Sequence, residues 1–138
     1  LIDVDHFKHA NDRHGHVAGD SVLREVGECI SSNLRGADTA GRYGGDEFCV
    51  LLPRATPAQA YEVLERVRAA VSALRFTEAE DLQVSLSIGI AGYSQALADT
   101  TAWLNAADAA LYQAKHQGRN CIVLADTPPA EALVAQPG

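Results

Sequence analysis

Two groups of acidic residues in this 138-residue chain have the residue types and spacing of a divalent-cation site. Asp3 and Asp5 follow a short apolar run, and Asp46 and Glu47 follow a pair of glycines. If the two segments are neighbouring strands, these carboxylates meet at one edge of a sheet. Hard oxygen ligands of this kind suit Mg²⁺, which keeps several waters and also binds substrate phosphates. Either group on its own is more typical of an acidic, solvated turn.

Several other sites are excluded by the spacing of residues in the same region. An EF-hand needs an oxygen ligand where Phe7 stands and a glycine where Lys8 stands. The chain has no G-x-x-x-x-G-K segment, so it is not a P-loop enzyme. Four histidines lack the regular spacing of zinc ligands, and we interpret them as solvated loop residues: His6, His9, His14 and His16.

The charge balance limits the binding partners. The chain has 11 Lys and Arg against 18 Asp and Glu, a formal net charge of −7. Because such a surface repels a phosphate polymer, we expect no nucleic-acid polymer as a partner. A single nucleotide is still compatible, because bound cations invert the local field.

The cysteine pattern and the hydropathy indicate a cytoplasmic domain, and membrane anchoring of the full protein stays open. Cys29, Cys49 and Cys121 are far apart and form no C-x-x-C pair, which favours buried free thiols in a reducing compartment. No apolar run approaches the ~18 residues of a membrane span, and no signal peptide is visible. The chain opens inside a strand without an initiator methionine, so we expect an excerpt of a longer polypeptide.

The first third of the chain predicts a strand and one long helix. Residues 1–4 are an apolar run that enters a loop, and the polar residues 11–16 predict a turn. Apolar residues recur at helical spacing over 18–35. We expect Asp20 in the first turn of this helix and Gly36 at its end.

Residues 38–52 have the pattern of a β-hairpin. Gly44 and Gly45 can supply the positive φ of a tight turn between the two strands. Residues 48–52 are apolar at every position, which predicts a central strand that Pro53 ends.

The remaining elements are a helix, a strand, a second helix and a final strand. Pro57 opens the first helix, the strand over 84–90 alternates so that one face points inward, and Gly118 ends the second helix. Residues 121–124 are a last strand, and 126–138 a disordered tail. In the helix that Pro57 opens, the side chains expected on the buried side are Ala60, Tyr61, Val63, Leu64, Val67, Ala70, Val71 and Leu74.

This order of elements predicts the fold class. A hairpin set between helices is not the strict alternation of a dinucleotide-binding fold. We therefore expect an α+β domain in which helices pack on a mostly antiparallel central sheet. Because nearly half of the residues are apolar, the chain can build one core of its own.

Residues 42–48, Arg-Tyr-Gly-Gly-Asp-Glu-Phe, resemble the defining motif of the GGDEF family of diguanylate cyclases. Other blocks are similar to the family in order and spacing, and together they span residues 1 to about 124. These blocks are Asp3-Val-Asp-His-Phe-Lys8, Asn11-Asp12, Gly15-His16, Gly19-Asp20, Ala107-Asp108, Leu111-Tyr112, Ala114-Lys115 and Gly118-Arg-Asn120.

The resemblance implies a fold and a reaction. The fold would be nucleotidyl-cyclase- or polymerase-palm-like with a ferredoxin-like core, over a domain of residues 1–125. The reaction would join two GTP molecules into cyclic di-GMP with release of pyrophosphate. Most members carry a D-x-L-T-G-L-x-N-R-like segment before the first strand, and this sequence has none. Each site holds half of the product, so a homodimer is implied, usually brought together by an upstream sensory or receiver domain.

The resemblance also implies roles for individual residues at the metal and catalytic centre. Asp3, Asp46 and the carbonyl of Val4, with Glu47, would hold Mg²⁺ or Mn²⁺. Asp46 and Glu47 would assist removal of the proton from the attacking 3′-hydroxyl. Lys8 would stabilise charge in the transition state.

A second set of residues would bind the nucleotide. Asn11 and Asp20 would recognise guanine through a donor and acceptor pattern that adenine does not match. The backbone at the glycine pair would approach the nucleotide closely. The remaining members of this set are Phe7, Gly44, Gly45, Lys115 and Arg119. Lys115 and Arg119, together with Lys8, are cations suited to the triphosphate.

The R-x-x-D segment formed by Arg35 and Asp38 ends shortly before the glycine pair. In the family, this spacing marks an inhibitory site for the product, and Arg66 is a candidate second arm. Two alternatives to a product-inhibited cyclase remain open: a catalytically silent module that binds GTP or cyclic di-GMP, and a cyclase that acts on ATP. The intact acids favour catalysis, and Asn11 and Asp20 favour GTP.

Overall fold

The computed structural model describes residues 1–77, 79–95, 97 and 99–126. The predicted tail, 126–138, lies outside this part except for Asp126. In chain order the elements are β1 (Ile2–Val4), α1 (Phe7–His14), α2 (His16–Ser32), β2 (Thr39–Arg42), β3 (Glu47–Leu51), α3 (Pro57–Ser72), β4 (Leu86–Ile90), α4 (Thr100–His116) and β5 (Ile122–Leu124).

The strands form one sheet in the order β2-β3-β1-β4-β5. β1 lies antiparallel between β3 and β4, and β2 and β3 form an antiparallel hairpin. Only the pairing of β4 with β5 is parallel. The prediction of a mostly antiparallel sheet, with a central strand from the second half of the hairpin, is therefore confirmed.

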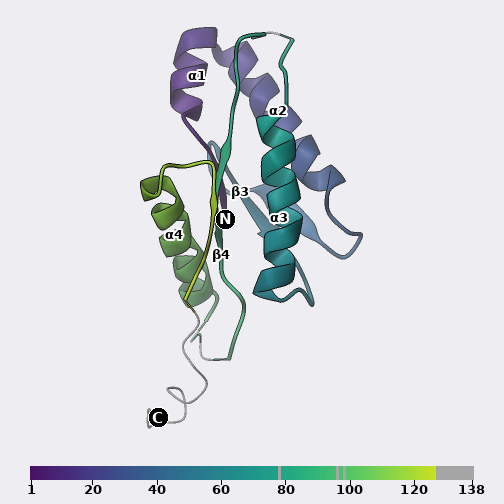
Figure 1. Ribbon diagram of the computed structural model, residues 1–138, viewed down its shortest axis with the longest axis vertical. Helices are drawn as coiled ribbons and strands as arrows, with labels where there is room; N and C mark the ends of the chain where they lie inside the picture. The colour runs from purple at the N-terminus through teal and green to yellow at the C-terminus, as the bar shows by residue number, and fades with distance from the viewer. Residues whose placement is uncertain (78, 96, 98, 127–138) are drawn as a thin grey trace.

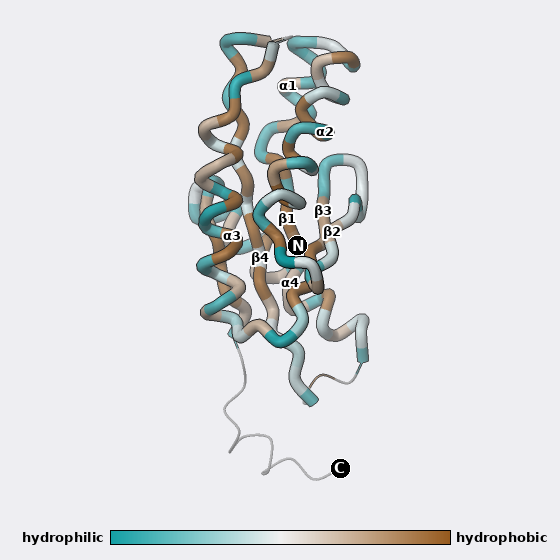
Figure 2. The backbone as a smooth tube through the Cα atoms, turned by 90° about the vertical axis from the view of Figure 1, so that its right-hand side faces the viewer, coloured by the Kyte–Doolittle hydropathy of each residue, from teal (hydrophilic) through white to brown (hydrophobic). Residues whose placement is uncertain are grey.

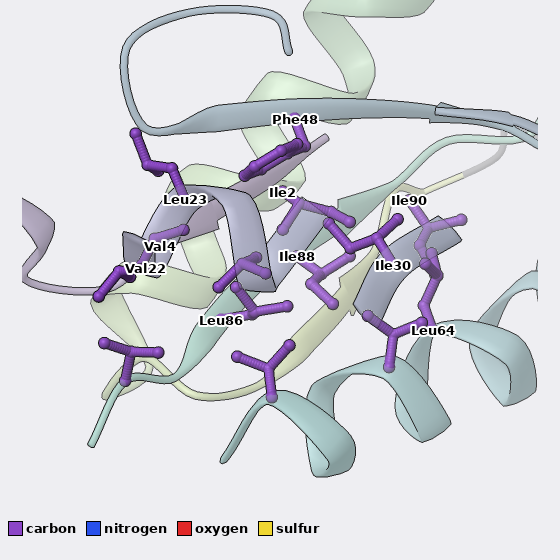
Figure 3. Close-up of a cluster of buried hydrophobic side chains, with 14 of the residues drawn as sticks. Ile2, Val4, Val22, Leu23, Ile30, Phe48, Leu64, Leu86, Ile88 and Ile90 are labelled. Atoms are coloured by element: carbon purple, nitrogen blue, oxygen red, sulfur yellow. The ribbon is translucent and has the colours of Figure 1, made fainter. Parts of the chain in front are cut away.

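Helices cover both faces of this sheet. Figure 1 shows α4 on one side of the strands and α2 and α3 on the other, with α1 at one end. On the α2 and α3 side, the fully buried residues Ile2, Ile88 and Val67 belong to a single apolar cluster. Figure 3 shows side chains of β1 and β4 pointing toward those of α2 and α3 in this cluster. This core fixes the relative positions of the strand ends that carry the acids.

Strand β4 is buried on both faces, so the prediction of a single inward face is wrong. All five of its residues are buried, and Ser87 is fully inaccessible. A Cβ atom at Gly89 would overlap the carbonyl oxygen of Ala107 and the amide nitrogen of Leu111. The backbone of α4 therefore lies directly on the strand, and a small residue is needed at the contact.

The first helical region also differs from the prediction. Of the residues expected to form a turn, 11–14 belong to α1, in which only Ala10 is buried, and His16 belongs to α2. Gly15, with φ of 90°, separates α1 from α2. Because α2 begins at His16, Asp20 lies beyond its first turn, and the helix ends at Ser32, before Gly36. His9 and His14 lie on α1 and His16 on α2, so the prediction that they are loop residues is wrong.

Helix α3 begins where Pro57 predicts. The Thr56 Oγ1 accepts from the amide of Gln59 at 3.2 Å, and the Gln59 side chain accepts from the amide of Thr56 at 3.0 Å. This reciprocal pair satisfies two amide groups at the helix start. Apolar residues lie along β4 and recur along α3 (Figure 2). Tyr61, predicted on the buried side, is 39% exposed, so that assignment is wrong.

None of the helices in the described residues is both long enough and apolar enough to cross a membrane.

Candidate active site

Asp3 and Asp46 meet at one end of the β1–β3 pair. Asp3 is paired with Glu47 across the two strands, and the amide of Val4 donates to the carbonyl oxygen of Asp46 at 3.1 Å. The expectation that the two acidic segments are neighbouring strands is confirmed. The carboxylates of Asp3 and Asp46 are close enough for Asp46 to raise the pKa of Asp3.

The Asp3 carboxyl group is buried and incompletely bonded. It is 7% exposed, and its Oδ2 forms an ion pair with the ammonium of Lys115 on α4. In the part of the chain that the structure describes, its Oδ1 has no hydrogen-bond partner. Burial is the main cause that raises the pKa of Asp3 to about 6, and Asp46 adds to it while Lys115 opposes it.

Lys115 brings positive charge to the same position. Burial opposes the charged ammonium, but the hydrogen bond and charge of Asp3, with Glu47 and Asp46 nearby, raise the pKa of Lys115 above its ordinary value. The lysine is therefore held as a cation beside the carboxylates.

Asp5, in the turn directly after β1, does not join this group, although it bonds Ser87, the residue paired with Asp3 across the strands. It is 7% exposed and accepts hydrogen bonds from Ser85, Ser87 and the amide of Asn120. The expectation that all four acids converge is therefore wrong for Asp5. The signal in the sequence was the pair of serines at alternate positions, Ser85 before β4 and Ser87 within it, which the pattern over 84–90 places among the small or polar residues that alternate with the apolar ones.

The residues expected to bind guanine lie where α1 packs against α2. A Cβ atom at Gly19 would overlap Oδ1 of Asn11 and approach Cζ of Phe7 at 3.3 Å. The Asn11 amide lies 3.2 Å from the Nδ1 atom of His16. Asn11 is thus brought against the helical turn that carries Asp20, whose side chain is exposed. Gly19 permits this close approach.

The glycine pair forms an open turn between β2 and β3. The amides of Tyr43 and Gly44 donate to the carbonyl oxygen of Glu47, at 2.8 and 3.4 Å. The Arg42 side chain donates to the carbonyl oxygen of Gly45. A Cβ atom at Gly45 would meet no heavy atom within 4 Å. Neither glycine has a positive φ, so that prediction is wrong, but the backbone is open to a ligand.

The other two predicted phosphate ligands are exposed. Lys8 lies on α1, one residue after Phe7. Arg119 lies in the turn after α4, four residues beyond Lys115. Within the described residues, the side chain of neither one forms a hydrogen bond or an ion pair with the protein, so both are available to an anion.

The two ends of the R-x-x-D segment, Arg35 and Asp38, are bonded to each other. The Arg35 guanidinium donates to both Asp38 oxygens, at 3.2 and 3.3 Å, and to the carbonyl oxygen of Pro53 at 3.4 Å. These bonds hold the pKa of Asp38 below its usual range. Arg66 is exposed on α3, and no hydrogen bond or ion pair links it to Arg35 or Asp38 in the described residues.

A hollow of about 880 Å³ lies between α4 and the loop that follows β3. Its lining is mainly apolar and includes Trp103, Leu104 and Leu51, and among the described residues it has one cationic side chain, Arg54, and no carboxylate. Because a nucleotide triphosphate with its metal needs several cations and carboxylates, this hollow suits it less well than the site at Asp3 and Asp46.

A family model described as "Diguanylate cyclase, GGDEF domain" matches residues 1–121. The chain belongs to this family. It is 42% identical over 125 residues to diguanylate cyclase A of Treponema denticola, covering 90% of this chain and 34% of that protein. It is 44% identical over 126 residues to the response regulator PleD of Caulobacter vibrioides, covering 89% of this chain and 28% of that protein. The chain thus spans about a third or less of these relatives.

Solved GGDEF domains share the fold. The GGDEF domain of PA1120 from Pseudomonas aeruginosa matches with a TM-score of 0.84 and 41% identity, covering 92% of this chain and 80% of that one. The GGDEF domain of DgcB from Caulobacter crescentus, solved in complex with c-di-GMP, matches with a TM-score of 0.84 and 34% identity, covering 91% and 75%. The predicted family and fold class are confirmed.

The acids of this GGDEF domain fit a divalent cation. Asp3 offers a buried oxygen that no described residue hydrogen-bonds, and Asp46 lies beside it. Within the described residues, no group of three or more His, Cys, Asp or Glu side chains is arranged to hold a metal ion. That is compatible with Mg²⁺, which is commonly bound by one or two carboxylates and completes its shell with water and substrate phosphates.

Proposed function

We propose that this GGDEF domain is a diguanylate cyclase that condenses two GTP molecules into cyclic di-GMP and two pyrophosphates. In each half-reaction the 3′-oxygen of one GTP would bond to the α-phosphorus of the other, and the bond to pyrophosphate would break. The observation that carries the proposal is the convergence of Asp3 and Asp46 beside Lys115, in a chain whose relatives include named diguanylate cyclases.

The metal would be Mg²⁺ or Mn²⁺, held by Asp3, Asp46 and the carbonyl of Val4, with Glu47 beside them. When bound, it would neutralise charge on the phosphates and favour ionisation of the attacking hydroxyl. Asp46 and Glu47 would accept the proton of that hydroxyl. Because both acids border the open turn at Gly44 and Gly45, a nucleotide can approach them without meeting a side chain from the glycines.

The remaining roles divide between the two ends of the nucleotide. Asn11 and Asp20 would bond the polar edge of guanine, with Phe7 packed beside them. Adenine would leave these polar groups unpaired, which costs roughly 1–3 kcal/mol each. Lys115, Lys8 and Arg119 would neutralise the triphosphate, and Lys8 would stabilise charge in the transition state. Two GTP-loaded copies must face each other, so the active form would be a homodimer.

The test is pyrophosphate release from GTP and Mg²⁺, measured on the chain and on the chain joined to a parallel dimeric coiled coil. Asp46→Asn is expected to reduce release by about a thousandfold. Glu62→Gln, which removes an exposed charge on α3, is the matched control and should leave it unchanged. Tight GTP binding without turnover in the dimerised wild type would instead favour a silent binding module, and equal turnover of ATP would overturn the guanine assignment.

We also propose that Arg35 and Asp38, with Arg66 as a second arm, form an inhibitory site for cyclic di-GMP. The Arg35 side chain is 60% exposed and its guanidinium is already oriented by Asp38, so its outward donors are available for a phosphate or a guanine edge.

Arg35→Ala is expected to weaken cyclic di-GMP binding about tenfold or more, because a charge-assisted contact is lost. GTP turnover without product should be unchanged. Calorimetry with cyclic di-GMP measures the first effect, and Arg75→Ala, a change of another exposed arginine, is the control. Unchanged product affinity in Arg35→Ala would remove the inhibitory assignment and leave the cyclase proposal intact.

A further inference from the structure

Both oxygens of the buried Asp5 carboxylate are occupied by donors from other parts of the chain. Oδ1 accepts from the hydroxyl of Ser87 at 2.5 Å, and Oδ2 accepts from the hydroxyl of Ser85 at 2.7 Å. The amide of Asn120 donates to Oδ2 at 3.0 Å. A carboxylate with three such donors is satisfied without a cation, so its role differs from that of Asp3.

The third donor belongs to a turn with an uncommon backbone. Gly118, Arg119 and Asn120 have φ of 108°, 64° and 48°, three consecutive positive values. Glycine adopts this region readily and asparagine adopts it fairly often, but an arginine such as Arg119 adopts it at a cost in free energy. This conformation therefore needs bonds that hold it.

The turn is tied at both of its non-glycine residues. The amide of Arg119 donates to the carbonyl oxygen of Ala114 at 3.0 Å, the closing bond of a Schellman-type helix end. The amide of Asn120 donates to Asp5. The side-chain oxygen of Asn120 accepts from Arg68 Nη1 at 2.8 Å, and Arg68 is itself paired with Glu65 on α3. The backbone of Arg119 is thus held by its own bond to Ala114 and by the bonds of Asn120, the next residue, while the Arg119 side chain is exposed.

We propose that Asp5 is a positioning residue that holds the 118–120 turn, and thereby Arg119, in place for the polyphosphate tail of the nucleotide. This inference rests on the proposed function, in which Arg119 binds the triphosphate. Asp5 would contact neither the nucleotide nor the metal. It would act through the amide of Asn120, and its effect would be confined to ligands that carry the β- and γ-phosphates.

The experiment compares the affinities of two ligands in the presence of Mg²⁺ by calorimetry. One is the α,β-methylene analogue of GTP, which cannot lose pyrophosphate, and the other is GMP. Asp5→Asn keeps the size of the side chain but turns one acceptor into a donor that faces other donors. Asp5→Asn is expected to lower the affinity for the triphosphate analogue about tenfold and to change the affinity for GMP by no more than about twofold.

A double-mutant cycle with Arg119→Ala tests whether the effect passes through Arg119. In the Arg119→Ala background, Asp5→Asn should cause no further loss of affinity for the triphosphate analogue. Ser85→Ala removes one donor to Asp5 and should give a smaller loss of the same kind, about threefold, in a variant that folds readily. Ile30→Val destabilises the core away from the turn and should leave the ratio of the two affinities unchanged.

Each result assigns the failure to one proposal. If Arg119→Ala does not weaken the triphosphate analogue, the phosphate-binding role of Arg119 falls, and the positioning role of Asp5 falls with it. If Arg119→Ala weakens binding but Asp5→Asn and Ser85→Ala do not, or if their losses add to that of Arg119→Ala, only the positioning role is overturned. A loss that is equal for GMP and the triphosphate analogue would also overturn it.

Discussion

Asp3, in β1, and Asp5, in the turn directly after it, are two residues apart and equally buried, yet their hydrogen-bond partners and nearby charges differ. Among the residues that the structure describes, none donates to one of the Asp3 oxygens; a second acid lies beside Asp3, and its pKa is raised to about 6. Asp5 has three donors around its two oxygens. The first position stores an unfavourable charge that a cation would relieve, and the second stabilises the fold as it stands.

The difference shows that burial alone does not identify a metal ligand. A buried carboxylate becomes available to a cation when its own protein leaves it short of donors and places another negative group nearby. At Asp5 the neighbouring strand and the turn after α4 supply the donors. At Asp3 the described residues contribute one cation, the Lys115 side chain. In the proposed function this lysine also binds the triphosphate, so Asp3 would share it with the nucleotide.

The largest effect is expected from Asp3→Asn. Pyrophosphate release in the dimerised protein should fall by about a thousandfold, because a charged ligand is lost. The free energy of unfolding of the metal-free chain should stay the same or rise, because the raised pKa of Asp3 means that its ionised form is less favourable in the folded chain than in the unfolded one, and Lys115 keeps Asp46 and Glu47 nearby. Urea denaturation checks the second part. A large loss of stability would show that Asp3, like Asp5, is primarily structural, and the contrast would disappear.

The next effect is on stability at Asp5. Asp5→Asn should lower the free energy of unfolding by about 2–3 kcal/mol, because it leaves buried donors facing a donor. Denaturation by urea at neutral pH measures it. Asp12→Asn, which changes an exposed acid on α1, is the matched control and should cost little. A cost at Asp5 no larger than that of the control would mean that the three donors do not stabilise the fold.

The smallest effect is the pH dependence of Mg²⁺ affinity, which is expected from Asp3. Because the metal-free Asp3 has a pKa of about 6, it is protonated as the pH falls from 7 to 5, and its affinity for Mg²⁺ should fall with it. Below pH 6 the loss should be about tenfold per unit. Fluorescence or calorimetric titration with Mg²⁺ at each pH measures it, and Asp3→Asn should remove this dependence.

The raised pKa of Asp3 affects stability in the opposite direction: lower pH weakens Mg²⁺ binding but stabilises the metal-free fold. A carboxyl group whose pKa is higher in the folded state than in the unfolded chain binds its proton more tightly when folded. The free energy of unfolding of the metal-free wild type, relative to Asp3→Asn, should therefore rise as the pH falls from about 6 toward 4. A fall over this range would contradict the raised pKa.

Elements with strong local signals could be predicted from the sequence. Pro57, preceded by Thr56, opens a helix through a capping box made entirely by nearby residues. The hairpin around Gly44 and Gly45 also follows from local residue types, although its backbone lacks the expected positive φ. Helix α1 was missed because it has only one buried residue, Ala10, and no apolar stripe. Its stability depends on packing against α2 through Gly19, which no local pattern shows.

By itself, the sequence determined the family, the order of most elements and the candidate acids, because motifs and capping signals depend on residues close together in the chain. Only the tertiary structure decided which acid is satisfied. The donors to Asp5 come from residues 80, 82 and 115 positions away, and the cation beside Asp3 comes from the last turn of α4. Hydrogen bonding and desolvation act through space, so the different chemistry of these two aspartates arises only when distant strands and turns are brought together.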